Sequence, residues 1–189
     1  MLLVLCGYSA TGKDTYQNML LEQNKDLKRA LSATTRPIRP GETDGVEYIF
    51  LEENLYNMIK KDGKILSERT YYTIQNGENA VWHYGLIKRD FENEDCITIL
   101  DHEGAARVRN ILGPDLVRIA YFETIDAELY RRSEGRQDEP AEFERRLKDD
   151  KIKFIGIENI ADLTINSGGP TSVHEANLRA INKLLGGNV

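Results

Sequence analysis

Residues that build disulfide frameworks and metal centres are scarce in this chain. It has 2 cysteines and 3 histidines among 189 residues. Cys6 and Cys96 each lie within an apolar run, a pattern that predicts buried thiols in a reducing cytoplasm and not a disulfide. The histidines His83, His102 and His174 lack the spacing of metal ligands, so we expect no structural metal site.

The chain also has fewer positive than negative charges and lacks long hydrophobic runs. The 25 lysines and arginines are outnumbered by 31 acidic residues, which gives a net charge of −6. Because nucleic-acid-binding proteins are generally basic, we expect no nucleic-acid partner, and a local basic site here indicates a small anionic ligand. The first residues, MLLVLCG, predict neither a signal peptide nor a membrane span. Protein partners stay undefined.

The chain does contain an alternation of short apolar runs and amphipathic stretches. We expect buried strands at 2–6, 96–100, 116–122 and 163–165, and helices between them, including 103–112 and 126–133. This alternation is typical of an α/β fold with a central parallel sheet flanked by helices. Residues 34–95 break the rhythm and predict an inserted lobe, with strand-like stretches at 46–50 and 71–74 and a helix near 53–61.

Three helices carry specific signals. In the first, Tyr16, Met19 and Leu20 share one face. Pro140 suits the first turn of another. Before the last helix Ser172 and Glu175 have the spacing of a capping box. The expected apolar stripe of that helix consists of Val173, Ala176, Ala180, Ile181 and Leu184.

The first apolar run leads into a glycine-rich loop, GYSATGKDT, at residues 7–15. Gly7, Gly12 and Lys13 have the G-x-x-x-x-G-K spacing of a P-loop, between a strand and a helix as that motif requires. Backbone N–H groups of such a loop surround phosphates, and the lysine reaches the β- and γ-phosphates of ATP. The loop residues expected to bind ATP are Gly7, Ser9, Ala10, Thr11, Gly12, Lys13, Asp14 and Thr15.

A magnesium ion is expected beside the triphosphate. Asp14 stands where a P-loop usually carries a Ser or Thr that binds Mg²⁺, and Thr15 supplies a hydroxyl one residue later. We hypothesise that Asp14 orients a water on the metal. Asp101 ends the second strand, where an aspartate approaches the metal in P-loop folds. The metal-site candidates are therefore Thr15, Asp14 and Asp101, partly through water.

A second anion-binding segment reads TTRPIRPGETDGVEYIF at residues 34–50. Proline restricts the residue before it, so Arg36 before Pro37 and Arg39 before Pro40 cannot lie in an ordinary helix. Two guanidinium groups on a stiffened, extended loop suit bidentate binding of an anion. For this segment alone, a solvated basic loop is the alternative.

The two segments together resemble the guanylate kinase family. Its monophosphate-binding motif runs T-T-R-x-x-R-x-G-E-x-x-G-x-x-Y-x-F. Every fixed position is filled here, by Thr34, Thr35, Arg36, Arg39, Gly41, Glu42, Gly45, Tyr48 and Phe50. The resemblance covers almost the whole chain and implies a single domain. Its parts would be a core of 1–33, 96–125 and 155–189, a monophosphate-binding lobe of 34–95 and a helical lid of 126–154.

The resemblance also implies roles for residues outside the two segments. The stretch LYRRSEGR and the later ERRL are similar to the family's lid. The catalytic residues implied, besides Lys13, are Arg132, Arg136 and Arg146. Asn166, at the end of ADLTIN, would lie near the ATP base. For Arg131 and Arg145 we expect salt bridges on helix surfaces.

In that family the acceptor is GMP. Arg36 and Arg39 would hold its phosphate, together with the hydroxyls of Tyr48 and Tyr84, and Glu42 belongs to the same motif. A carboxylate favours guanine, whose pairing edge presents two donors, over adenine, which presents an acceptor there. The base-binding matches are Ser32, Glu68, and either Asp101 or Glu103.

This sequence departs from the family at the base contact. The stretch between Glu68 and Tyr84 is longer than usual, so the register of Glu68 is open, and Leu86 stands where a hydroxyl often follows Tyr-Gly. The segment after Asp101 is shorter than the common form, so Asp101 and Glu103 remain alternatives.

The activity implied is ATP-dependent phosphorylation of GMP or dGMP by direct transfer, with Mg²⁺. Two alternatives stay open: a kinase for another (deoxy)nucleoside monophosphate or a ribose bisphosphate, and a non-catalytic guanylate-kinase-like binding module. Such modules typically lose the P-loop lysine and the lid arginines. This chain keeps Lys13, Arg132 and Arg136, so the enzyme is favoured.

Overall fold

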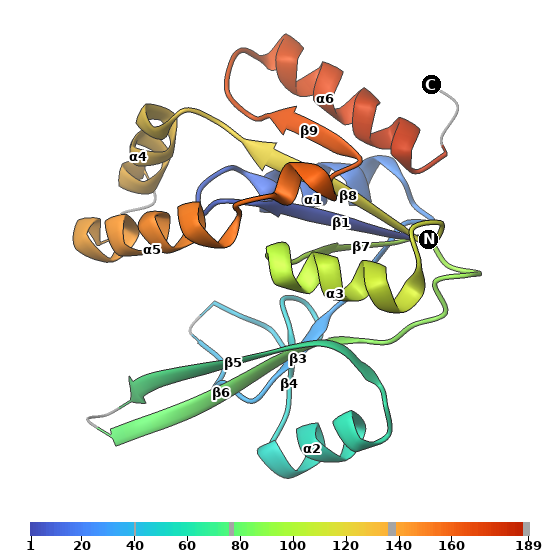
Figure 1. Cartoon of the computed structure of the whole chain (residues 1–189), viewed down its shortest axis with the longest axis vertical. Coiled ribbons are helices and arrows are strands. Elements are labelled where there is room, and N and C mark those ends of the chain that lie inside the picture. Colours follow the sequence, from blue (N-terminus) through green and yellow to red (C-terminus); the bar gives the residue numbers. More distant parts are fainter. Residues whose placement is uncertain (40, 76–77, 136–138, 187–189) are drawn as a thin grey trace. The chain divides into compact units, whose positions relative to one another are not determined.

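The computed structural model describes residues 1–39, 41–75, 78–135 and 139–186 (Figure 1). The chain forms two compact units, one of Met1–Lys28 with Phe91–Val189 and the other of Arg29–Asp90. In the described ranges each unit has its own sheet, with five strands in the first and four in the second. Among the described residues, no helix has the length and apolar character needed to cross a membrane.

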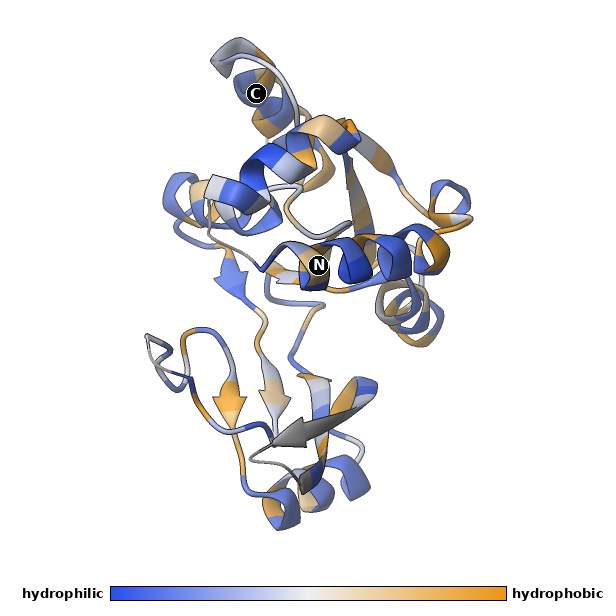
Figure 2. Cartoon of the chain, turned by 90° about the vertical axis from the view of Figure 1, so that its left-hand side faces the viewer, coloured by the Kyte–Doolittle hydropathy of each residue, from blue (hydrophilic) through white to orange (hydrophobic). Residues whose placement is uncertain are grey.

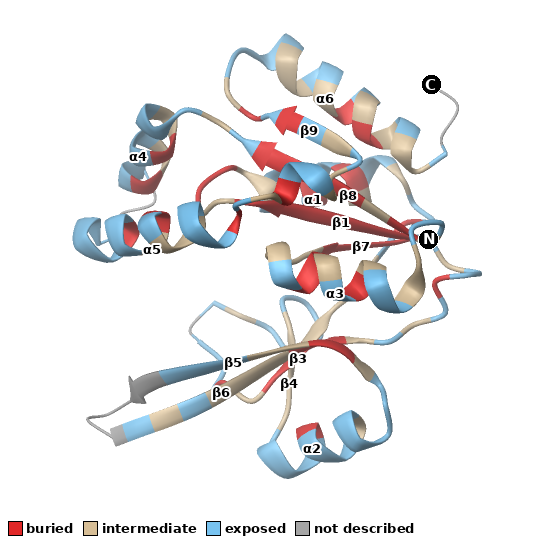
Figure 3. Ribbon diagram, viewed as in Figure 1, coloured by how far each residue is buried: buried red, intermediate tan, exposed pale blue. Residues whose placement is uncertain are grey.

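The larger unit is built on a sheet in the order β2-β7-β1-β8-β9. These strands are β1 (Leu2–Gly7), β2 (Lys28–Arg29), β7 (Cys96–Ile99), β8 (Val117–Glu123) and β9 (Leu163–Asn166). β1 pairs in parallel with β7 and β8, and β8 pairs in parallel with β9. Every residue of β1 is buried, as expected for a central strand covered on both faces (Figure 3). The predicted α/β fold with a parallel sheet is confirmed.

Helices cover both faces of this sheet. The helices of the larger unit are α1 (Lys13–Gln23), α3 (His102–Leu112), α4 (Asp126–Gly135), α5 (Pro140–Lys153), the short 3₁₀ helix η1 (Ile157–Asn159) and α6 (Thr171–Leu184). Leu20 of α1 and Ile181 of α6 share one apolar core with Leu3, Leu5 and Phe122 of the sheet. α3 contacts β1 and β8 from the other side (Figure 1). The helices carry both hydrophilic and hydrophobic residues (Figure 2), as expected for helices that pack one face on a sheet and expose the other to solvent.

Two expectations about helix faces are confirmed only in part: Tyr16 and Leu20 of α1 and Ile181 of α6 are buried, but other residues of the two expected faces are not. Met19 is 37% exposed, and the buried face of α1 instead uses Gln17 beside Tyr16 and Leu20. In α6, Leu178 and Ile181 are the buried residues, whereas Ala176 is exposed. Ile181 and Leu184 still contact the core as expected, whereas Leu178 takes the buried place that was expected for Ala176.

The capping box expected at Ser172 is also wrong. Pro170 is the N-cap of α6, makes no side-chain capping hydrogen bond, and is followed by Thr171 as the first helical residue. Ser172 therefore already lies inside the helix, where its side chain cannot cap the start. The restricted backbone of proline prepares this start without a side-chain acceptor.

The expectation that both thiols are buried and not linked in a disulfide is confirmed, since Cys6 and Cys96 are fully buried in adjacent strands and form no disulfide. Burial raises the pKa of the Cys6 thiol far above its ordinary value. Both residues are core side chains, and the Cys6 thiol is not a nucleophile at neutral pH.

The smaller unit is a four-stranded sheet in the order β4-β3-β6-β5. Its elements are β3 (Ser32–Thr34), β4 (Ile49–Phe50), α2 (Glu53–Lys61), β5 (Ile65–Gln75) and β6 (Glu78–Ile87). β6 runs antiparallel to both β3 and β5, while β3 and β4 are parallel. The predicted helix at 53–61 is confirmed; β4 is shorter than the stretch 46–50 expected for it, and β5 extends beyond both ends of the expected 71–74.

Candidate functional site

The glycine-rich loop joins β1 to α1 in the larger unit. Gly12 has φ +87, and a Cβ added to Gly7 would collide with the carbonyl oxygen of Phe122. Ala10 is also left-handed, with φ +65, a conformation that residues other than glycine rarely adopt. The sequence thus forms the compact, strained backbone that a phosphate loop requires at this place.

Lys13 folds back over this loop. Its Nζ donates to the carbonyl oxygens of Gly7 at 2.8 Å and Tyr8 at 2.7 Å and to Thr11 Oγ1 at 3.1 Å. The Thr11 hydroxyl is buried and donates to the Tyr8 carbonyl at 2.7 Å. Three loop oxygens therefore hold the ammonium group against the loop.

The helices α4 and α5 pack directly on the loop. Ala10 shares a buried apolar cluster with Leu129 of α4 and with Phe143 and Leu147 of α5. From α5, Asp150 Oδ2 accepts a hydrogen bond from the backbone N–H of Ser9 at 2.7 Å. An internal carboxylate thus occupies one of the N–H groups that a phosphate loop offers to anions.

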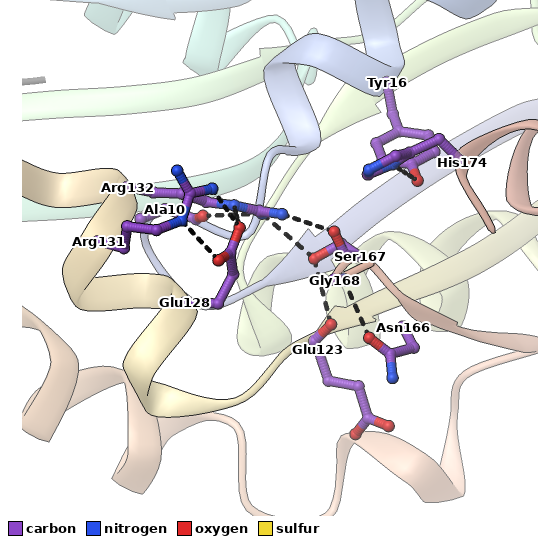
Figure 4. Close-up of polar contacts among 10 residues, drawn as sticks. All are labelled: Ala10, Tyr16, Glu123, Glu128, Arg131, Arg132, Asn166, Ser167, Gly168 and His174. Atoms are coloured by element: carbon purple, nitrogen blue, oxygen red, sulfur yellow. Dashed lines mark hydrogen bonds and ion pairs between the residues drawn. The ribbon is translucent and has the colours of Figure 1, made fainter. Parts of the chain in front are cut away.

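Arg132 of α4 links three elements of the larger unit (Figure 4). Its guanidinium donates to the carbonyl oxygen of Ala10 at 3.3 Å and to that of Ser167 at 2.6 Å, and its Nε donates to Glu128 at 2.7 Å. An added Cβ at Gly12 would lie 3.4 Å from Arg132 Nη1. Of the expected lid arginines, this one therefore lies against the phosphate loop.

Of the other two expected lid arginines, Arg146 lies on α5. Arg146 is 36% exposed, with its Nε 3.8 Å from a carboxylate oxygen of Glu142. Arg136 lies outside the described residues, as does Pro40 of the second segment.

The surface roles expected for Arg131 and Arg145 are confirmed. Arg131 is 70% exposed and pairs with Glu128 at 2.7 Å, and Arg145 pairs with Glu142 and Asp149, each at 2.7 Å. Hydrogen bonds from Arg131 and then Arg132 lower the pKa of Glu128 to about 2. Glu128 therefore stays ionised and holds Arg132 in place.

The magnesium candidates lie at the starts of α1 and α3, the helices that follow the neighbouring strands β1 and β7. Asp14 and Thr15 are exposed in the first turn of α1, and Asp101 is the N-cap of α3, where its Oδ1 accepts from the N–H of Gly104 at 2.9 Å. The Cys6 thiol lies 3.8 Å from the Asp101 carbonyl, so β7 ends beside the start of the loop. Within the described part of the chain, no group of three His, Cys, Asp or Glu residues could hold a metal alone. The carboxylates of Asp14 and Asp101 and the hydroxyl of Thr15 are oxygen ligands of the kind that a hard cation takes when phosphates and water supply most of its coordination.

Two further candidate residues of the larger unit are exposed to solvent. Asn166, at the end of β9, is exposed, and its Oδ1 accepts from the N–H of Gly168 at 3.0 Å (Figure 4). Glu103 is exposed in the first turn of α3.

In the smaller unit, Arg36 is the centre of a polar cluster. Its side chain is 3% exposed and forms two hydrogen bonds with Glu42, at 2.9 and 2.8 Å. Its Nε donates to the Tyr84 hydroxyl at 3.0 Å, and the guanidinium lies over the rings of Tyr48 and Phe50 at 5.7 and 5.4 Å. We call these five residues the Arg36 cluster. The hydrogen bonds from Arg36 lower the pKa of Glu42.

Arg39 is placed differently from Arg36. Its backbone N–H donates to Glu42 Oε2 at 2.8 Å, while the residue itself is exposed. Glu42 therefore fixes the chain at both arginines, and of the two it is Arg39 whose side chain is accessible to solvent.

The structure does not bring all base-binding candidates together. Ser32 of β3 is paired with Leu86 of β6, and Thr34 with Tyr84, so Ser32 shares a face with Tyr84. Glu68 pairs with Gly85, one residue out of phase with Tyr84, and its carboxylate is 2.7 Å from Lys60 of α2. Glu68 thus lies on the opposite face of the sheet from the Arg36 cluster.

One residue at the loop was missed by the sequence interpretation. The sequence assigns no role to Asp150, yet its carboxylate contacts the phosphate loop. A signal did exist, because Asp150 follows Arg146 by four residues and so lies on the same side of α5. Nothing in the sequence says which element that side would meet.

The buried parallel sheet, the strained loop after β1 and the lysine folded over it define a P-loop nucleotide-binding protein of the α/β class. A family model described as guanylate kinase matches residues 1–143. The chain belongs to the guanylate kinase family. The expectation of an enzyme of the nucleoside monophosphate kinase class is thereby confirmed.

Relatives and a solved structure agree with this assignment. The guanylate kinase of Sphingopyxis alaskensis is 34% identical over 136 residues, which are 72% of this chain and 60% of the relative. That of Thermobifida fusca is 33% identical over 180 residues, which are 92% of this chain and 85% of the relative. The crystal structure of guanylate kinase from Anaplasma phagocytophilum has the same fold, with a TM-score of 0.68, 21% identity, and coverage of 98% of this chain and 85% of that one.

Proposed function

We propose that this chain transfers the γ-phosphoryl group of ATP directly to GMP or dGMP, yielding ADP and the diphosphate. One combination carries the proposal: a phosphate loop with Lys13 folded over it and the Arg36 cluster occur in one chain of the guanylate kinase family. Each binds phosphate by a different means, backbone N–H groups in one case and guanidinium groups in the other. A donor and an acceptor site are what a monophosphate kinase needs.

On the donor side, we propose that the loop residues from Gly7 to Thr15 bind the ATP phosphates and that Asn166 lies near the base. Lys13 would exchange its three loop acceptors for phosphate oxygens. Arg132, already fixed by Glu128 and Ser167, would stabilise charge on the transferring group. Arg136 and Arg146 are assigned the same task by the family resemblance.

Mg²⁺ is the cofactor that we propose, as in P-loop kinases generally. When bound, it would neutralise charge on the donor phosphates. Thr15, Asp14 and Asp101 would hold it, mostly through water, because Mg²⁺ keeps several of its waters. Asp101 has a structural duty as well, since it caps α3.

On the acceptor side, we propose that Arg39 makes the first contact with the monophosphate, because its side chain is exposed. Arg36 is oriented by Glu42 and, with the hydroxyls of Tyr48 and Tyr84, would complete the phosphate site. The attacking oxygen belongs to a phosphomonoester whose second pKa is about 6, so it is mostly ionised at neutral pH. No general base is therefore required of the protein.

A coupled assay tests the proposal by supplying ATP with GMP, dGMP, AMP, CMP, UMP and a ribose bisphosphate in turn. We expect turnover with GMP, and a loss of roughly 10²-fold or more for Lys13→Ala because a donor to the transferring phosphate is removed. Arg39→Ala should raise KM for GMP and leave that for ATP unchanged. Arg145→Ala, which removes an arginine paired on the surface of α5, is the matched control.

Two results would redirect the proposal. Preferred turnover of another acceptor would favour the alternative kinases, and tight nucleotide binding without turnover would favour a binding module.

We further propose a cytoplasmic enzyme without a nucleic-acid partner. The buried Cys6 and Cys96, which form no disulfide, and the net charge of −6 support this.

A further inference from the structure

The register between β5 and β6 determines which side chains can contact the nucleoside monophosphate that accepts the phosphoryl group. Ser67 is opposite Leu86 and Arg69 is opposite Tyr84, after a register shift between Ile65 and Ser67. Directly paired residues lie on the same face of a sheet, and successive residues alternate between faces. Ser67 and Arg69 therefore share a face with Tyr84 and Leu86. We call it the acceptor face.

The ring and hydroxyl contacts agree with this division. The Tyr84 hydroxyl accepts from Arg36, and its ring meets the edges of Tyr71 at 5.2 Å and Tyr48 at 5.7 Å between centroids. The guanidinium of Arg69 lies 4.8 Å above the Tyr71 ring. Arg69 and the Arg36 cluster thus lie on one continuous surface.

Glu68 belongs to the other face, which α2 covers. Its carboxylate lies 2.7 Å from Lys60 Nζ and 3.7 Å from His83 Nδ1, and the His83 ring stacks on Tyr56 of α2 at 5.5 Å. A Cβ on Gly85, the partner of Glu68, would lie 2.6 Å from the Tyr56 hydroxyl oxygen. Glu68 is therefore part of the contact between the sheet and α2.

Moving Glu68 to the acceptor face would need a shift of β5 by one residue. Such a shift transfers every side chain of a strand to the opposite face. It would withdraw Arg69 from Tyr84 and break the Lys60 pair at once. The carboxylate of Glu68 is consequently unable to read guanine while the strands keep this register.

Arg69 offers the opposite hydrogen-bonding chemistry from a carboxylate. A guanidinium only donates, so it cannot read the N1–H and the 2-amino group of guanine, but it matches the acceptor pair O6 and N7 in bidentate fashion. Stacking on Tyr71 sets the plane of the guanidinium, which reduces the cost of ordering it on binding.

We propose that Arg69, and not Glu68, is the base-recognition residue that β5 supplies, and that it reads the O6 and N7 acceptors of a 6-oxopurine. The proposal rests on the monophosphate kinase function above and concerns how its acceptor is chosen. Glu68 is assigned a structural role between β5 and α2.

Calorimetric titration with GMP and with 7-deaza-GMP, which lacks the N7 acceptor, tests this without turnover. A bidentate contact between arginine and a base discriminates by roughly 5- to 150-fold. We expect the wild-type protein to bind 7-deaza-GMP at least about fivefold more weakly than GMP. In Arg69→Ala, which removes every donor of the side chain, the two dissociation constants should become equal within about twofold, whereas Arg69→Lys, which keeps a donor but loses the planar guanidinium, should lower the ratio without abolishing it.

Two further variants distinguish the structural role assigned to Glu68 from the base-recognition role assigned to Arg69. Glu68→Gln should keep the wild-type ratio of the two dissociation constants and lower the unfolding temperature. Lys64→Ala, which removes an exposed cation of the same unit, should change neither, and thermal unfolding of each variant checks its fold.

Three outcomes overturn the proposal. The first is an unchanged ratio in both Arg69 variants. The second is an equal loss of affinity for every nucleotide in those variants, which would make Arg69 a phosphate ligand. The third is loss of discrimination between GMP and IMP, which lacks the 2-amino group, in Glu68→Gln alone. If the ratio behaves as expected but no phosphoryl transfer occurs, the proposed activity fails and this assignment stands.

Discussion

Replacing Glu42 by alanine should destabilise the smaller unit and impair acceptor binding together. Glu42 makes two hydrogen bonds to the guanidinium of Arg36 and one to the N–H of Arg39, at 2.8 to 2.9 Å. Arg36 is 3% exposed, so its charge would be left without its partner in a desolvated place. Glu42 itself is 18% exposed, which admits some water and reduces the cost.

The magnitude follows from these contacts. Breaking a fully buried ion pair costs about 3–5 kcal/mol, and hydrogen bonds to charged groups contribute about 1.5–3 kcal/mol. With partial access of water at Glu42, we expect a loss of about 2–3 kcal/mol. For a chain of this size, this corresponds to a fall of about 4–12 °C in the unfolding temperature.

Thermal and urea unfolding measure this loss, with Glu52→Gln as a control because Glu52 is exposed and makes no capping hydrogen bond. Added sulfate should restore stability in Glu42→Ala more than in the wild type, since an anion can take the place of the carboxylate at Arg36. KM should rise for GMP and not for ATP. A variant as stable as the control, or one indifferent to sulfate, would refute the reasoning.

Three further predictions concern other contacts. Asp150→Asn should raise the affinity for ATP by about tenfold in calorimetry, because a negative charge no longer occupies the N–H of Ser9, and equal or weaker binding would contradict it. Gly85→Ala should cost about 1–3 kcal/mol in urea unfolding, because the new Cβ meets Tyr56, and an unchanged midpoint would count against this packing. The pKa of Glu128 is lowered from its ordinary value of 4.5 to about 2, so its contribution to stability is present above pH 4.5 and is lost as the pH falls to about 2. Glu128→Gln should therefore flatten the pH dependence of unfolding in that interval, and an unaltered acid limb would argue against the pair.

Local patterns allowed the donor loop to be predicted from the sequence. Leu2–Cys6 is continuously apolar, Gly7, Gly12 and Lys13 have a fixed spacing, and a helix follows, so each requirement of a P-loop lies within about 20 residues. The helix at 53–61 was equally accessible, because its bounds depend on a local amphipathic pattern. Such local features do not depend on which helix or strand packs against the segment in the folded chain.

The face of Glu68 could not be predicted in the same way. It depends on how β5 pairs with β6 and on the register shift beside Ser67, and a change of one residue reverses the result. The contact of Asp150 with Ser9 joins residues 141 positions apart, which no local pattern encodes. At the start of α6, a proline took the place that the serine was expected to fill.

The central claim is that one chain hands the γ-phosphoryl group of ATP directly to a monophosphate. Phosphorus NMR of a mixture of protein, Mg²⁺, ATP and GMP follows every product at once. The account predicts that ADP and GDP appear in equal amounts without free phosphate, and that Lys13→Ala stops both. ADP accompanied by inorganic phosphate in place of GDP, or no change in ATP at all, would contradict it.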